Sequence, residues 1–143
     1  IMAMRIYYSQ CQWNEPRTIH AHGGDRKEDY MESILTSIKK LLGIHADDTS
    51  FDPDIIMHIN SVFMILRQLG VGPEEGFAIE GEDALWTDFM PAGAMLEGVK
   101  SYMYMKVRLL FDPPTTASMF DSMKRLTDEF EWRLNVAAES AAQ

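Results

Sequence analysis

The octet LLFDPPTT, residues 109–116, lies between the two longest amphipathic patterns in the chain. Neither proline can continue a helix interior, and each one drives the residue before it toward an extended backbone. Asp112 is therefore either a carboxylate held in a rigid loop or part of a joint between two helices. Because no base, histidine or second ligand lies near it in the chain, we predict a structural corner formed by Asp112, Pro113 and Pro114. Thr115 or Thr116 can then cap the following helix.

Apolar side chains recur at steps of three and four on both sides of this corner, which predicts one amphipathic helix before it and one after it. The stripe before the corner consists of Leu96, Val99, Met103, Val107 and Leu110. The stripe after it consists of Met119, Met123, Leu126, Phe130 and Leu134. We expect both stripes to face the core.

Two further helices are predicted upstream. The first has apolar residues on one face and stops at Gly43: Ile34, Leu35, Ile38, Leu41 and Leu42. The second begins at Asp52-Pro53-Asp54, where we predict an N-cap, a proline in the first turn and an acid that favours the helix dipole. Its stripe runs to Gly70 and includes Ile55, Ile56, Ile59, Val62, Phe63, Leu66 and Leu69. The fold class is therefore all-α, with about four core helices in a compact bundle.

Residues 71–91 interrupt the helical pattern with glycines, prolines and acidic residues. We predict a long irregular or small-hairpin insert between the second and third helices. Long ordered inserts are often where a domain makes its contacts. We therefore expect subunit or partner contacts here, from Glu74, Glu75, Phe77, Trp86, Phe89 and Met90.

Residues 1–30 show no sustained period of helix or strand. The stretch RKEDYM, residues 26–31, can be encoded with AAGGAGG shortly before an ATG, which has the form of a bacterial ribosome-binding site. We therefore predict that residues 1–30 are a non-native or disordered leader and that residues 31–143 form a single helical domain. A genuine flexible N-terminal arm is the alternative.

Composition argues against most chemistries. The net charge of −9 disfavours nucleic-acid binding, and the single cysteine, Cys11, builds neither a disulfide nor a cysteine zinc site. The sequence lacks a membrane-spanning run, a nucleophile elbow and a complete P-loop. The four histidines lack a metal-ligand pattern, and the acidic run in residues 74–88 lacks the spacing of an EF-hand. We expect no catalytic, cofactor-binding or metal-binding residue, hence no enzyme and no cofactor.

Methionine is abundant, with 11 residues in the chain. Some lie on the predicted core stripes, but the others exceed what one small core should hold: Met57, Met64, Met90, Met95 and Met105. Flexible thioethers are common at interfaces, so this surplus favours self-association.

Three stretches carry a family resemblance: MESILTSIKKLLGI (31–44), DPDIIMHINSVFMILRQLGVGPEEGF (52–77) and LEGVKSYMYMKVRLLFDPPTTASMFDSMKRLTDEFEWRLN (96–135). Together they resemble the small helical head-tail connectors of tailed bacteriophages and prophages of Gram-positive bacteria, also called head-completion, neck-adaptor or DNA-packaging-like proteins. The resemblance covers nearly all of residues 31–135 and none of the leader.

The resemblance implies a non-enzymatic structural protein of the virion neck that is assembled in the host cytoplasm. It implies a homo-oligomeric ring beneath the portal protein that extends the DNA channel and carries the next neck or tail protein. DNA would pass through it without sequence-specific binding, and no membrane is involved. The alternative is a small acidic interaction or regulatory protein encoded by a prophage and acting as an oligomer. A metal-dependent hydrolase that uses the acidic loop is a weaker third hypothesis.

Overall fold

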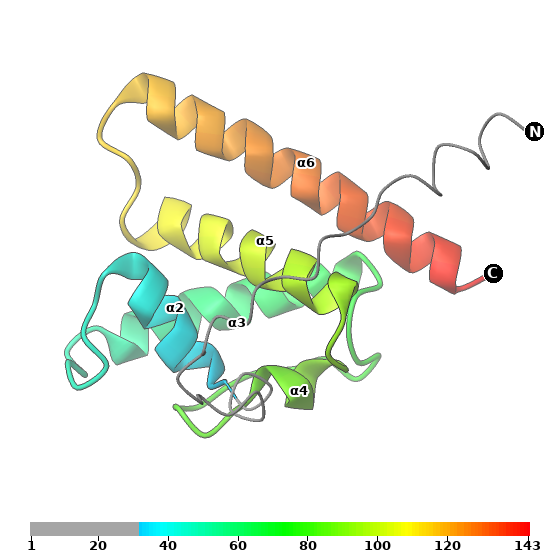
Figure 1. Cartoon of the computed structure of the whole chain (residues 1–143), viewed down its shortest axis with the longest axis horizontal. Helices are drawn as coiled ribbons and strands as arrows, with labels where there is room; N and C mark the ends of the chain where they lie inside the picture. Colours follow the sequence, from blue (N-terminus) through cyan, green and yellow to red (C-terminus); the bar gives the residue numbers. More distant parts are fainter. Residues whose placement is uncertain (1–31) are drawn as a thin grey trace, which may run out of the picture.

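The computed structural model describes residues 32–143, so the predictions made for residues 1–30 lie outside the described part of the chain. Figure 1 shows α5 between α6 on one side and α2, α3 and α4 on the other. The helices are α2 (Ile34–Leu42), α3 (Asp52–Gln68), α4 (Trp86–Phe89), α5 (Ala94–Phe111) and α6 (Ala117–Ala141). The all-α prediction is confirmed, and residues 32–143 form four longer helices and one short one.

Local sequence sets the ends of α2. The Ser33 hydroxyl caps its first turn by accepting a hydrogen bond from the Thr36 backbone N–H at 3.3 Å. Gly43 ends it in the left-handed conformation, with φ 80°, and its N–H bonds back to the last turn. The predicted stop at Gly43 is therefore confirmed.

The start of α3 differs from the prediction by one residue. Phe51, not Asp52, occupies the N-cap position, and it makes no side-chain cap hydrogen bond. Asp52 is the first helical residue, and its carboxylate is drawn to the Lys39 ammonium of α2, with Nζ and Oδ1 2.7 Å apart. An ion pair between helices has thus replaced the local cap that we expected.

We predicted that the insert after α3 would be either irregular or a small hairpin. It is irregular and does not form a hairpin. The described residues contain no strand there, only an isolated bridge between Ser33 and Leu85. The Asn60 side chain holds both backbone groups of Ile79, donating to the carbonyl at 2.9 Å and accepting from the N–H at 2.8 Å. Because the backbone polar groups of Ile79 are satisfied by α3, they need no neighbouring strand.

The core lies where α2, α3 and α5 meet, and the insert closes one side of it. Its fully buried members include Ile38, Ile59, Phe63, Val99 and Met103. By contrast, α6 contributes one apolar side chain to the buried core, Leu134, at 4% exposure. The last helix therefore covers α5 without entering the centre of the bundle.

A candidate interaction surface between α5 and α6

The structure places the six predicted contact residues in different environments. Trp86 and Phe89 lie in the core at 2% and 4% exposure, and the Trp86 indole N–H donates to the Ser37 hydroxyl at 2.8 Å. Phe77 and Met90 are half-buried against the same core. Glu74 and Glu75 are exposed. The two most buried residues thus have a structural role, and the contact prediction rests on the exposed pair.

Residues 112–116 form the joint between α5 and α6. Asp112 leaves the helical conformation, with φ −143° and ψ 74°, immediately before the two prolines. Its carboxylate pairs with Arg108 one turn earlier, at 3.1 Å, which gives it a local structural partner. Thr116 caps α6 by accepting from the Met119 backbone N–H at 3.4 Å.

The apolar stripe of α6 does not face the core along its whole length, contrary to our expectation. Met119 is 63% exposed and Leu126 is 46% exposed, whereas Leu134 is buried. The stripe before the corner also ends in solvent, because Leu110 is 51% exposed. The N-terminal half of α6 therefore lies beside α5 without closing onto it.

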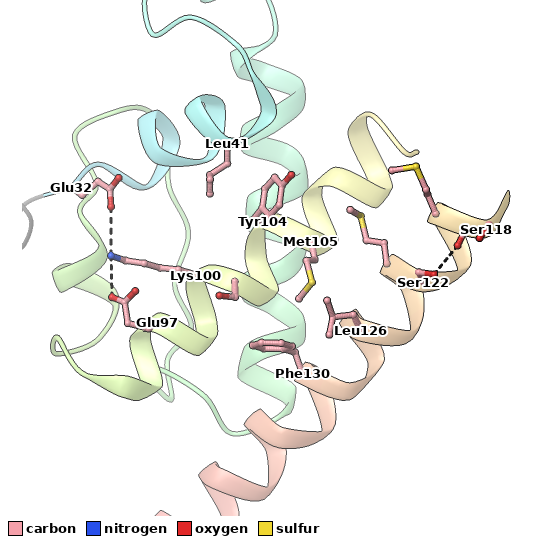
Figure 2. A pocket seen from close by; sticks show the side chains of 13 residues that line it. Glu32, Leu41, Glu97, Lys100, Tyr104, Met105, Ser118, Ser122, Leu126 and Phe130 are labelled. Carbon is pink, nitrogen blue, oxygen red and sulfur yellow. Dashed lines mark hydrogen bonds and ion pairs between the residues drawn. The ribbon is translucent and has the colours of Figure 1, made fainter. Parts of the chain in front are cut away.

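An open groove lies between these helices (Figure 2). It has a volume of about 820 Å³ and is lined mostly by carbon and sulfur atoms. Its apolar lining comes from α2, α5 and α6 and consists of Leu41, Tyr104, Met105, Met119, Met123, Leu126 and Phe130. We call this feature the α5–α6 groove.

Charged residues mark one rim of the α5–α6 groove. Lys100 on α5 lies 3.5 Å from a carboxylate oxygen of Glu32 and 3.4 Å from one of Glu97, as Figure 2 shows. Two carboxylates therefore share one ammonium, which leaves the rim with an excess negative charge. Both pairs are partly exposed and add little to stability.

Polar contacts and close packing hold α6 on α5 beyond the groove. The Tyr102 hydroxyl donates to the Glu131 carboxylate at 2.7 Å, and the Lys106 ammonium reaches the same oxygen at 3.1 Å. Burial of the ring raises the pKa of Tyr102 far above its usual value, and the hydrogen bond to Glu131 raises the pKa further. Leu134 of α6 packs beside Gly98 of α5, where an added Cβ would make ordinary van der Waals contact with Leu134 Cδ2 at 3.5 Å.

The described residues show no metal-binding cluster beside this groove. Within residues 32–143 no three His, Cys, Asp or Glu side chains come together to hold a metal ion. His58 packs edge-on against Phe111, with ring centroids 6.4 Å apart. No helix in this part of the chain is long and apolar enough to cross a membrane. The α5–α6 groove is thus the candidate functional site.

Sequence reasoning missed this groove because it assigned every apolar residue of the stripe to the core. Met119 and Leu126 follow the same three-four spacing as the buried Leu134, so the pattern gives no signal that separates them. The methionines expected to be surplus divide in the structure. Met57 and Met64 on α3 are 56% and 59% exposed, while Met105 is buried at 7% and lines the groove.

Comparison with known proteins identifies the family. The model of the family described as phage connector protein matches residues 34–141, which run from the first residue of α2 to the last residue of α6. No curated protein and no solved structure matches the chain. Because the match spans all five helices of the described residues and most of the chain, the protein belongs to the phage connector protein family, a family of bacteriophage head-tail connectors.

Proposed function

We propose that the protein forms a homo-oligomeric ring at the portal vertex of a phage head, joins head to tail and extends the DNA channel. The observation that carries this proposal is the family match over residues 34–141. The neighbours in this arrangement are the portal protein on one side and the next neck or tail protein on the other. The virion neck is then its final location, after assembly in the host cytoplasm.

The surface of the described chain is compatible with this role. The α5–α6 groove leaves apolar side chains in water that a connector can bury against its neighbours. The chain carries a net charge of −9, and like charge discourages DNA from adhering to the wall of a channel. Both features support a structural part better than a catalyst.

Deletion of the gene in the phage or prophage that carries it tests the proposal. We expect particles with packaged or leaking heads and separate tails, and restoration of joined virions by the full chain supplied in trans. Electron microscopy of the purified chain mixed with portal protein should show rings on the portal. Normal infectious virions in the absence of the gene would refute the connector role.

The second candidate, a small acidic oligomeric regulator encoded by a prophage, draws on the same exposed apolar groove. The two hypotheses differ in where the protein ends up. A connector is present in purified virions at a fixed number of copies for each particle, whereas a regulator is absent from them. Quantitative mass spectrometry of purified virions separates the two.

A further inference from the structure

We propose that the α5–α6 groove receives the outer face of α6 from a second copy of this chain, with Trp132 as the inserted side chain. This inference rests on the proposed ring and specifies the contact that builds it. It assigns each subunit a receiving surface and an inserting surface that are different from each other. Such a heterologous contact is the kind that can close into a ring.

The inserting surface lies on α6 itself. Trp132 is 64% exposed and Val136, one turn later, is 38% exposed. Phe130, which lines the groove, is two residues from Trp132, so the two side chains leave the helix about 200° apart. One helix therefore presents an apolar groove wall on one side and an apolar anchor on the opposite side. Copies stacked in one direction would bring each anchor to the next groove.

Charge on the outer face of α6 is mixed, with one cation available to the groove rim. The groove rim has an excess negative charge, because Glu32 and Glu97 share Lys100. Arg125 lies two turns before Trp132 on the outer face of α6, and it forms no ion pair with another residue of the described chain. Arg125 can meet the acidic rim, whereas Asp121, Asp128 and Glu139 lie on the same face of α6 as Trp132. The apolar anchor and groove therefore carry the pairing, and the Arg125 contact helps to fix its register.

The size of the contact explains why a ring needs many copies. A tryptophan buries about 150 to 250 Å² and tryptophan is enriched among interface hot spots, but a stable interface needs about 800 Å² from each partner. One anchor in one groove supplies only part of that area. We therefore expect weak association of free chains, with a dissociation constant between about 1 μM and 1 mM, that is strengthened when the ring closes.

Sedimentation of the purified full chain over a range of concentrations tests the contact. We expect species larger than a dimer for the unaltered chain. Trp132→Ala should weaken association by about 30-fold or more, as should Leu126→Glu, which places a charge in the groove. The matched controls are Met64→Ala and Leu110→Glu, since these side chains are similarly exposed and do not line the groove. Both controls should associate like the unaltered chain.

Mixing separates the two surfaces. Equal amounts of Trp132→Ala and Leu126→Glu retain one intact anchor and one intact groove, so the mixture should form dimers and nothing larger. A disulfide readout does not depend on either variant. In a Cys11→Ala background, Val136→Cys should cross-link to Ser101→Cys in a mixture, and neither should cross-link to itself.

Several results would overturn the proposal. These are a chain that stays monomeric up to 1 mM, an unaltered chain that stops at a dimer, cross-linking of Val136→Cys to itself, or association that Trp132→Ala leaves unchanged. Loss of portal binding by Leu126→Glu with unchanged self-association would assign the groove to the portal and equally refute the contact. None of these results touches the connector role, which depends on virion assembly in the deletion experiment.

Discussion

The ion pair between Lys39 and Asp52 is the sharpest test of how this small core is held together. Lys39 is a charged residue at 3% exposure, with its ammonium 2.7 Å from Asp52 Oδ1 and 2.9 Å from the Ala46 carbonyl oxygen. Apart from this pair, no described group donates to Oδ1. Lys39→Met keeps the length of the side chain and removes the charge, which leaves a carboxylate facing an apolar neighbour.

The expected loss follows from burial. Removing one partner of a fully buried ion pair costs about 3 to 5 kcal/mol, because the other charge stays desolvated. The Asp52 side chain is 20% exposed, so water recovers part of that cost, and we expect a loss of about 2 to 3 kcal/mol. The midpoint of urea unfolding should fall by about 1 to 2 M for a slope near 1.5 kcal/mol/M. The neighbouring Lys40 is exposed, and Lys40→Met should change stability by less than about 0.5 kcal/mol.

A double variant completes this experiment. Adding Asp52→Asn to Lys39→Met removes the unpaired charge, so at least half of the lost stability should return. Far-UV circular dichroism before denaturation checks that each variant starts folded. If Lys39→Met costs no more than Lys40→Met, the ammonium and carboxylate gain nothing from each other and the reasoning fails.

Three further perturbations have expected outcomes. Tyr102→Phe should cost about 1 kcal/mol by chemical denaturation, since it removes a hydrogen bond to a partly exposed carboxylate. The pKa of Tyr102 is raised in the folded chain. The protonated hydroxyl therefore contributes its full stability below the unfolded pKa of about 10, and this contribution declines as the pH rises above that value. Unfolding midpoints between pH 8 and 11 should fall less steeply in Tyr102→Phe. Gly72→Ala should lower stability by about 2 to 4 kcal/mol, because φ is 93° and a Cβ would overlap an aromatic ring of α4, whereas Gly81→Ala meets open space and serves as the control. Replacing Pro113 and Pro114 by alanine should impair folding or ring assembly, and unchanged thermal unfolding together with normal rings would show that the prolines do not hold the corner.

The helical parts of the fold were predictable because local chemistry and burial agree there. Ser33 and Gly43 supply the cap and the stop of α2, and the three-four spacing of α3 matches its buried side chains, such as Ile59 and Leu66. The cap of α3 was not predictable from neighbours in the chain. Lys39 lies thirteen positions before Asp52, and only the packed bundle brings the two charges together.

The candidate site was less predictable, since exposure depends on which helices oppose each other. The insert residues Trp86 and Phe89 were expected at a contact surface, but the core beside Phe63 takes both rings, with centroids 6.5 and 4.8 Å from the Phe63 ring. Met119 and Leu126 were expected in the core, yet no described helix covers them. A periodic pattern identifies the apolar face of a helix, but not whether a partner helix lies opposite it.

The two halves of α6 explain why the groove stays open to a partner. The C-terminal half is fixed, because Glu131 bonds to Tyr102 and Lys106 and because Leu134 packs beside Gly98. The N-terminal half starts from a corner in which two prolines restrict the backbone. Closing the groove within one chain would require α6 to bend or pivot between these two constraints. A sequence that keeps apolar residues on such a face departs from the usual agreement between pattern and burial, and departures of this kind occur mainly at functional sites. The exposed half of α6 therefore supports the proposed subunit contact better than it supports a defect of packing.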